Sequence, residues 1–319
     1  MRVLVTGAAG FIGSHLCERL IERGDQVCGI DNFNSYYAPE QKRKNIFELK
    51  NSEKFELVHG DIRDRDLMLS VVEFFKPDAI AHLAGMAGVR NSVANPELYT
   101  AVNINGSQNL LDAARKTGTC RSFVFASTSS IYGDTRTIPF VESDAAIEPP
   151  QPYAATKRAI ELLAYTYHKL YGLSFTATRF FTVYGPRGRP DMMPMLLANS
   201  IAHNQPIPYY GDKMSRDWTF VGDIVSGLVS ALETPLGYEI LNLGRGAPVP
   251  LKDFIGTMEK AAGAKANLRL EEKPAADVFL TYADCSKAQR LLGYSPEVSV
   301  DEGVKIFWKW FSDQNRQVK

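Results

Sequence analysis

Tyr153 and Lys157 are the residues whose types and spacing most clearly suggest chemistry. They lie four residues apart in "YAATK", so on a helix their side chains project from the same face. A phenol with a pKa of about 10 must reach a pKa of about 7 to act as a base, which requires about 4 kcal/mol. A cation about 4 Å away supplies roughly that much at an effective dielectric constant of about 20. We therefore expect Lys157 to hold Tyr153 partly ionised as a general base.

A run of hydroxyl side chains precedes this pair in "FVFASTSSIYG". It follows a predicted buried strand and comprises Ser127, Thr128, Ser129 and Ser130. Ligands of open parallel sheets bind at the carboxyl ends of the strands, where these hydroxyls are expected. A tyrosine and a lysine on one helix face are otherwise common surface residues, so this position favours a catalytic function for the pair.

Three glycines follow the first predicted strand in "TGAAGFIG" and lead directly into a predicted helix. Glycines there allow positive φ and close approach of the backbone to a pyrophosphate, and the helix N-terminus offers free N–H groups. The pattern predicts a dinucleotide-binding turn. Its expected cofactor-binding residues are Gly7, Gly10, Phe11, Ile12 and Gly13.

Asp31 ends the second predicted strand, at nearly the 20-residue separation from the glycines that dinucleotide sites show. A carboxylate there accepts hydrogen bonds from the adenosine ribose hydroxyls and repels a 2′-phosphate. The expected cofactor is therefore NAD rather than NADP, and its positive nicotinamide is expected to help Lys157 to hold Tyr153 partly ionised.

The pattern of apolar runs predicts the elements that position these residues. Strands are expected at Arg2–Thr6, Gln26–Ile30, Phe55–Val58, Ala79–Leu83, Ser122–Ser127 and Ser174–Phe180, and helices near Phe11, Arg63, Val102 and Tyr153. This order predicts an α/β fold, a Rossmann-like doubly wound parallel sheet. We assign residues 1–180 to an NAD-binding domain, to which about 217–245 return, and 181–319 mainly to a smaller mixed α/β substrate-binding subdomain.

The composition excludes several classes of function. Lys+Arg and Asp+Glu are equal at 36 each, so neither nucleic-acid nor membrane-surface binding is expected. Four scattered cysteines and five histidines show no disulfide or metal-ligand spacing. A strand already begins at Arg2 and no later apolar run has membrane-spanning length, so we expect a cytoplasmic protein.

The glycine spacing and the Tyr-x-x-x-Lys pair resemble the extended short-chain dehydrogenase/reductase family. "RFFTVYGP", "RDWTFVGDIV" and "LNLG" match its nucleotide-sugar branch, so the resemblance covers nearly the whole chain. It implies a catalytic triad of Thr128, Tyr153 and Lys157 and a homodimer. It also implies further NAD contacts by Asn32, Asp61, Ile62, Leu83, Ala84, Gly85 and Asn103.

Within this family the segments "AGVRNS" and "GPRGRPDM" resemble the UDP-glucuronate 4-epimerases. A uronic acid carries a carboxylate, which charged or hydroxyl donors must distinguish from a neutral hexose. The candidates for this task are Thr182, Arg189, Ser129 and Ser130, with Arg90 and Arg187 as further cations. The resemblance also places Arg216 at the diphosphate and Asp277 near the nucleoside ribose, although Ala275 and Ala276 stand where relatives more often have glycine.

The absence of an acidic residue directly after Thr128 limits the types of reaction that we expect. Related 4,6-dehydratases and uronate decarboxylases carry acidic residues after the catalytic threonine, whereas this chain has Ser129 and Ser130 there. The chemistry should therefore stop at reversible oxidation of carbon 4 of a UDP-sugar, through a 4-keto sugar that turns over and is reduced on its other face. The alternatives are a UDP-glucose 4-epimerase, a decarboxylase or dehydratase and, from another class, an inactive NAD-binding scaffold.

Overall fold

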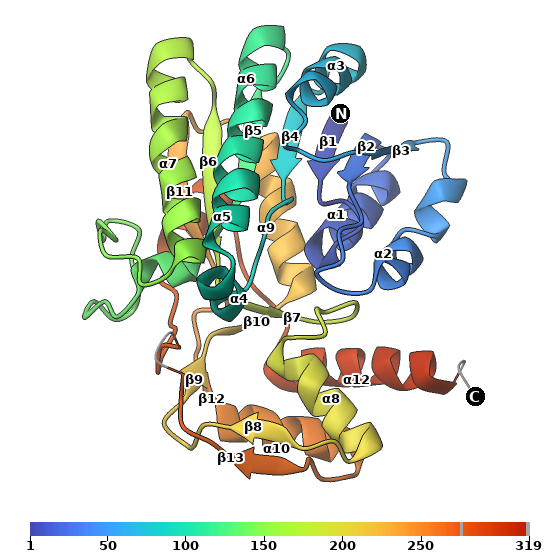
Figure 1. Ribbon diagram of the computed structural model, residues 1–319, viewed down its shortest axis with the longest axis vertical. Coiled ribbons are helices and arrows are strands. Elements are labelled where there is room, and N and C mark those ends of the chain that lie inside the picture. The colour runs from blue at the N-terminus through green and yellow to red at the C-terminus, as the bar shows by residue number, and fades with distance from the viewer. Residues whose placement is uncertain (275–276, 317–319) are drawn as a thin grey trace.

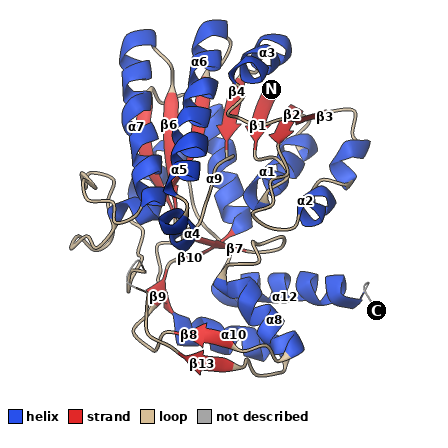
Figure 2. Ribbon diagram, in the orientation of Figure 1, coloured by secondary structure: helices blue, strands red, loops and turns tan. Residues whose placement is uncertain are grey.

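The structure is a computed structural model that describes residues 1–274 and 277–316. Its body is a parallel sheet of seven strands in the order β11-β6-β5-β4-β1-β2-β3, covered by helices on both faces (Figures 1 and 2). The strands are β1 (Arg2–Thr6), β2 (Gln26–Asp31), β3 (Phe55–His59), β4 (Ala79–His82), β5 (Ser122–Thr128), β6 (Phe175–Phe180) and β11 (Tyr238–Leu243). The predicted Rossmann-like α/β fold is confirmed, and the ends of its first six strands differ from expectation by at most one residue.

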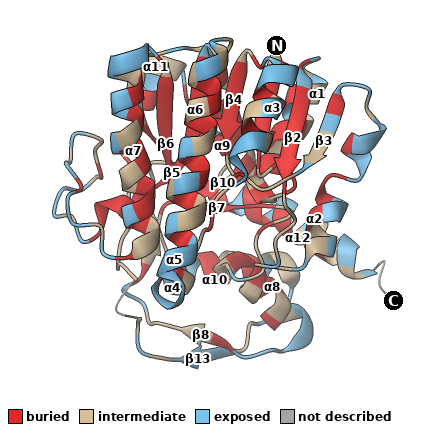
Figure 3. Ribbon diagram, turned by 45° about the horizontal axis from the view of Figure 1, so that its top comes forward, coloured by how far each residue is buried: buried red, intermediate tan, exposed pale blue. Residues whose placement is uncertain are grey.

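Two hydrophobic cores hold the helices against the sheet. One face carries α3 (Arg65–Phe75), α6 (Ser107–Thr117) and α7 (Pro152–Tyr171), and the other carries α1 (Phe11–Glu22), α9 (Val221–Glu233) and α11 (Ser286–Leu292). The five central strands between them are almost entirely buried, as expected for a parallel sheet covered on both faces, whereas the edge strands β3 and β11 are partly exposed (Figure 3). Burial on both faces explains why the strands read as continuous apolar runs rather than as alternating patterns.

The helix predicted near Val102 has an irregular start. Short helices α4 (Val89–Ala94) and α5 (Pro96–Tyr99) lead into η2 (Thr100–Gly106), a π-helical stretch that continues as α6. Such π-helical turns have wider hydrogen-bond spacing and are frequent at functional sites. The remaining short helices of this half are α2 (Pro39–Asn45), η1 (Glu48–Asn51) and η3 (Ser129–Tyr132).

The second half of the chain builds a smaller layer below the carboxyl ends of the strands (Figure 1). Its helices are α8 (Met193–His203), α10 (Leu251–Ala262) and α12 (Val300–Arg316). Three strand pairs join them: β7 (Thr182–Tyr184) with β10 (Trp218–Phe220), β9 (Ser215–Arg216) with β12 (Val249–Pro250), and β8 (Ile207–Tyr209) with β13 (Leu268–Leu270). Trp218 stacks on Phe254 in the core of this layer, with ring centroids 4.0 Å apart.

The stretch 217–245 lies in the larger, sheet-containing part of the protein. Helix α9 packs on β4 and β5, and strand β11 forms one edge of the main sheet. The boundary between residues 180 and 181 stays a prediction, and part of the 181–319 range lies outside the described residues.

In the described part of the chain, no helix has the length and apolarity needed to cross a membrane. The same residues contain no cluster of metal-ligating side chains.

Candidate active site

A cavity of about 740 Å³ runs from the glycine turn, across the carboxyl ends of the strands, to the smaller layer. It has the size and position of a ligand site in an open α/β sheet. Nearly all the predicted site residues line it. The two exceptions are Asn103 and Arg187.

The glycine turn between β1 and α1 has room only for glycine. Gly7 has a φ of +71°, and a Cβ on Gly13 would lie 2.0 Å from the carbonyl oxygen of Gly7. No side chain caps the first turn of α1, so its N–H groups remain available to an anion. The turn therefore has the form of a pyrophosphate cradle.

Asp31 is buried at the end of β2, and its two carboxylate oxygens are fixed by backbone donors. Phe33 N donates to Oδ1 at 2.8 Å, and Ala9 N donates to Oδ2 at 3.0 Å. Next to it, Asn32 Nδ2 donates to Asp61 Oδ2 at 2.8 Å. Hydrogen bonds from Arg63 lower the pKa of Asp61 to about 2, so this carboxylate is charged at neutral pH. Two anchored carboxylates thus stand at one end of the cavity.

Several residues of the loop after β2 line the same end, and the sequence analysis did not select them. Lys42 Nζ donates to the backbone oxygen of Asn34 at 3.0 Å and to its Oδ1 at 2.9 Å. The hydroxyl of Tyr37 is buried with no hydrogen-bond partner among the described residues, and so is Oε1 of Gln151 further along the cavity. Buried polar atoms without partners are costly, and both would gain from a polar ligand.

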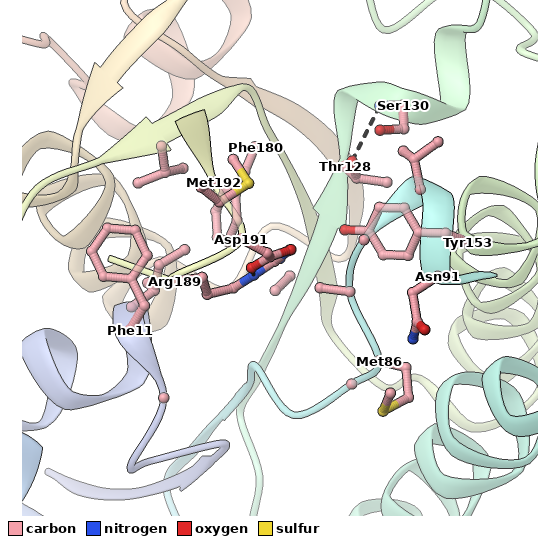
Figure 4. Close-up of a pocket in the computed structure, with 18 of the residues that line it drawn as sticks. Phe11, Met86, Asn91, Thr128, Ser130, Tyr153, Phe180, Arg189, Asp191 and Met192 are labelled. Carbon is pink, nitrogen blue, oxygen red and sulfur yellow. Dashed lines mark hydrogen bonds and ion pairs between the residues drawn. The ribbon is translucent and has the colours of Figure 1, made fainter. Parts of the chain in front are cut away.

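Tyr153 and Lys157 project from the first two turns of α7 toward the end of β5, as predicted. Figure 4 shows the hydroxyl of Tyr153 pointing into the cavity beside Thr128, and the ring of Tyr99 packs edge-on against the tyrosine. Thr128 Oγ1 accepts a hydrogen bond from Ser130 N at 3.1 Å, which leaves its own proton free to donate. The structure therefore brings the three predicted triad residues together.

Burial dominates the pKa of Tyr153 in the protein without ligands. Burial raises the pKa of Tyr153, and the opposing effects of a hydrogen bond from Thr128 and the charge of Arg189 are smaller. Lys157 is not among the groups that shift this pKa in the protein without ligands, and the predicted lowering by Lys157 together with bound NAD stays a prediction. Lys157 Nζ donates to the carbonyl of Ala126 at 2.8 Å and is itself deeply buried.

Burial also lowers the pKa of Lys157, to about 7, with the nearby Glu161 opposing the change. A Cβ on Gly85 would lie 3.0 Å from Asn103 Oδ1 and 3.2 Å from Lys157 Nζ, so the loop after β4 passes close to both side chains. Leu83, Ala84 and Gly85 all line the cavity here. Lys157 thus lies between this loop and the end of β5, facing the middle of the cavity.

Asn103 holds the loop after β4, and its predicted contact with NAD stays a prediction. Its Oδ1 accepts from Met86 N at 2.7 Å, and its Nδ2 donates to Met86 O at 3.0 Å and to Thr156 Oγ1 at 3.1 Å. These bonds occupy the amide and hold the loop after β4 against η2 and α7. The residue supports the cavity wall rather than lining it.

Arg189 lies in the middle of the cavity, between Phe11 and Tyr153 (Figure 4). It pairs with Asp191, with Nη2 to Oδ2 at 2.6 Å and Nε to Oδ1 at 3.0 Å, and Tyr36 donates to the same carboxylate at 3.0 Å. Burial opposes the charge on Asp191, but the bonds from Arg189 outweigh it and its pKa is lowered. The predicted cation is therefore present, already paired with an aspartate that the sequence analysis did not select.

Arg187 points away from the cavity. Its guanidinium pairs with Glu18 at 2.5 Å and donates to Ser14 Oγ at 3.3 Å, both on α1. The residue adopts a φ of +62°, which turns the chain so that Arg187 and Arg189 face opposite sides. Of the two arginines in "GPRGRPDM", only Arg189 lines the cavity.

The predicted nucleotide end of the cavity contains two further arginines. Arg90 Nη2 pairs with Asp277 Oδ2 at 3.0 Å, and its guanidinium lies over the ring of Tyr210 at 5.4 Å. Arg216 donates to the backbone oxygens of Ser215, Val278 and Phe279. All three charged residues line the cavity, whereas Ala275 and Ala276 lie outside the described residues.

Comparison with known proteins agrees with this arrangement. Residues 4–307 match the family model described as GDP-mannose 4,6 dehydratase. The chain belongs to this family. The resemblance to extended short-chain dehydrogenases/reductases is thereby confirmed, because this family is one of their branches.

One curated relative and two solved structures are similar to nearly the whole chain. A UDP-glucuronate 4-epimerase of Thermodesulfobacterium geofontis is 42% identical over 318 residues, which cover 99% of this chain and 98% of the relative. A crystal structure of UDP-glucuronic acid 4-epimerase from Bacillus cereus, in complex with UDP-glucuronic acid and NAD, superimposes with a TM-score of 0.92 at 35% identity, covering 98% of this chain and 100% of that one. A UDP-glucose 4-epimerase of Thermotoga maritima with UDP-glucose gives a TM-score of 0.90 at 29% identity, covering 99% and 100%.

Proposed function

We propose that the protein is a UDP-glucuronate 4-epimerase, an NAD-dependent isomerase that interconverts UDP-glucuronate and UDP-galacturonate. The observation that carries the proposal is the meeting of Tyr153, Lys157 and Thr128 at the centre of a cavity whose one end has the form of a dinucleotide site and whose middle contains Arg189. The epimerases among the relatives support the same reaction.

The residues at the first end of the cavity fit NAD. The glycine turn and the uncapped N-terminus of α1 would hold its pyrophosphate, and Asp31 would accept from the adenosine ribose hydroxyls. Asp31 and Asp61 would repel the additional phosphate of NADP. When bound, NAD accepts the hydride from carbon 4 of the sugar, returns it to the other face, and adds a positive charge near Tyr153.

The triad would remove the proton of the sugar 4-hydroxyl and return it. Tyr153 accepts this proton as the ketone forms and gives it back as the ketone is reduced. Thr128 donates its free proton to the sugar oxygen or to the phenolate, because its acceptor side is occupied by Ser130 N. Lys157 is a second donor beside the loop after β4, and its ammonium favours the ionised phenol once the cavity is closed to water.

The middle of the cavity offers donors for a uronate carboxylate. Ser129, Ser130 and Thr182 contribute hydroxyl groups to the wall of the cavity that also contains Arg189. Arg189 keeps its Nη1 group without a hydrogen bond to the described residues, whereas its Nε and Nη2 are held by Asp191. We therefore assign to Asp191 the orientation of Arg189 and to Arg189 the contact with the carboxylate.

The described acids of the cavity argue against loss of water or carbon dioxide. Asp31 and Asp61 lie at the cofactor end, Asp277 is paired with Arg90, and Asp191 is paired with Arg189. None of these carboxylates lies directly after Thr128, where the chain has Ser129 and Ser130, and the pKa of Asp191 is lowered, so it is a poor proton donor. A dehydratase or decarboxylase needs such a second acid/base group at carbon 5 or 6.

The direct test is incubation of the purified protein with UDP-glucuronate and no added cofactor, followed by identification of the products. We expect UDP-galacturonate, formed by NAD that stays bound through purification. Release of carbon dioxide or a 4-keto-6-deoxy product would identify a decarboxylase or a dehydratase. Turnover of UDP-glucose alone would identify a neutral-sugar epimerase, and turnover of neither sugar would favour an inactive scaffold.

The role of Arg189 predicts a change of substrate preference in a charge-neutral double variant. Arg189→Gln with Asp191→Asn should lower kcat/KM for UDP-glucuronate about 10- to 100-fold, the value of a charge-assisted hydrogen bond, and change UDP-glucose turnover much less. Arg187→Gln is the matched control, since this arginine pairs with Glu18 outside the cavity. An equal loss of both activities in the double variant would contradict the assignment.

We also propose a homodimer and a cytoplasmic location. The outer faces of α5 and α7 expose Leu98, Leu162 and Tyr165, apolar surface that a second copy would cover. All four cysteines are free thiols, as is usual in a reducing compartment.

The homodimer predicts that light scattering gives twice the chain mass, and that Leu162→Glu shifts the measured mass toward that of a monomer. A monomeric wild-type protein would contradict the proposal.

A further inference from the structure

A fully buried ion pair joins Glu161 and Arg179 directly behind the catalytic residues. Arg179 Nη2 donates to Glu161 Oε2 at 2.7 Å and Nε donates to Oε1 at 3.0 Å, and both side chains are 0% exposed. The arrangement is bidentate, which fixes direction as well as distance. Neither residue lines the cavity, so the proposed reaction does not use them directly.

The same carboxylate ties together the elements that carry the triad. Glu161 lies on α7, one turn after Lys157 and two turns after Tyr153. Ser127 Oγ donates to Glu161 Oε1 at 2.6 Å, and Ser127 immediately precedes Thr128 on β5. Arg179 is the direct neighbour of Ser127 on β6. One carboxylate therefore sets the position of α7 relative to the ends of two strands.

The arginine extends this network to the helix that carries Ser129 and Ser130. The guanidinium of Arg179 lies over the ring of Tyr132 on η3, 4.6 Å from its centroid. The hydroxyl of Tyr132 donates to Asn242 Oδ1 on β11 at 2.7 Å. A substitution of Glu161 would therefore alter the contacts that hold η3, as well as those that hold β5 and α7.

We propose that Glu161 is a positioning residue, whose carboxylate fixes α7 against β5 so that the hydroxyls of Tyr153 and Thr128 face the same sugar oxygen. The inference rests on the proposed function, because it concerns the geometry of that reaction. Displacements of about 1 Å in a catalytic group can lower turnover about 100-fold. The negative charge of Glu161 also favours the protonated form of Lys157, which burial disfavours.

A purely structural role makes a different prediction. Removing one partner of a buried ion pair strongly destabilises a fold, whereas replacing both by apolar side chains of similar volume is often neutral. Arg158 Nη1 also donates to Glu161 Oε2 at 3.0 Å, but its side chain reaches solvent and can be hydrated when the carboxylate is removed. The double variant Glu161→Met with Arg179→Met would then keep both stability and turnover. If the carboxylate positions the triad, this variant folds but loses turnover.

The experiment compares kcat, KM, bound NAD and unfolding temperature for the wild type, E161Q and E161M/R179M. We expect kcat to fall about 10- to 100-fold in both variants, with little change in KM or in bound NAD. E239Q is the control, because Glu239 on the edge strand β11 forms an equally short ion pair with Lys287 on α11, and neither residue lines the cavity. Wild-type kcat in a folded E161Q, or in a folded E161M/R179M if E161Q unfolds, would overturn the proposal.

The assay is run on whichever UDP-sugar the wild type turns over, so failure of the uronate assignment leaves this test intact. A wild type that turns over neither sugar would refute the proposed function alone. The inference would then be decided by crystal structures of the wild type and E161Q. Unchanged separation of the Tyr153 and Thr128 oxygens would overturn it, and a displaced Tyr153 would support it.

Discussion

Tyr153→Phe should lower kcat for UDP-glucuronate by roughly 100- to 10,000-fold, the usual contribution of a positioned general acid/base. The substitution removes the only atom that takes and returns the proton of the sugar hydroxyl in our mechanism. The phenyl ring keeps its edge-on packing against Tyr99, so fold and bound NAD should be retained. The measurement is kcat together with the cofactor content of the purified variant.

Tyr165→Phe on the same helix is the control, because that side chain is 46% exposed and lies outside the cavity. It should leave kcat unchanged. If Tyr153→Phe retained wild-type kcat, another group would have to carry the proton. Asp191 would be the nearest candidate, since it lies in the middle of the cavity beside Arg189.

Gly13→Ala should abolish cofactor binding. The new Cβ would lie 2.0 Å from the oxygen of Gly7 and 2.9 Å from its carbonyl carbon, so the turn between β1 and α1 must open. Both contacts are to backbone atoms, which a rotamer change does not relieve. The purified variant should contain no NAD and show no turnover, as measured by the cofactor released on denaturation.

Gly256→Ala is a suitable control for this substitution. Gly256 lies on the exposed face of α10 with nothing within 4 Å of an added Cβ. Alanine favours a helix over glycine by about 1 kcal/mol, so this variant should be slightly more stable and fully active. Full cofactor content in Gly13→Ala would show that the glycine turn does not hold NAD.

The sequence was sufficient where a local pattern determines the structure. The strands at Arg2–Thr6 and Ser122–Thr128 are continuous apolar or β-branched runs, and the glycines of the first turn each meet a backbone constraint. Tyr153 and Lys157 share a helix face at a spacing that any α-helix brings together. These features need only short-range geometry, and the structure has them where they were predicted.

What the sequence missed depends on partners far away along the chain. Arg189 meets Tyr36, which precedes it by 153 residues, and Asn103 meets Thr156, which follows it by 53. The burial that raises the pKa of Tyr153 in the protein without ligands arises from packing of several elements, which the spacing to Lys157 does not reveal. The sequence signal for Asp191 is its position two residues after Arg189, with which it forms an ion pair.

The most direct test of the mechanism uses UDP-glucuronate labelled with deuterium at carbon 4. Our account predicts UDP-galacturonate with the deuterium still on carbon 4, because the hydride is removed and returned within one closed cavity. It also predicts that no hydrogen is exchanged with water at carbon 4 or carbon 5. Loss of the label to solvent, or solvent hydrogen at carbon 5, would contradict hydride transfer at carbon 4 with Tyr153 as the proton acceptor.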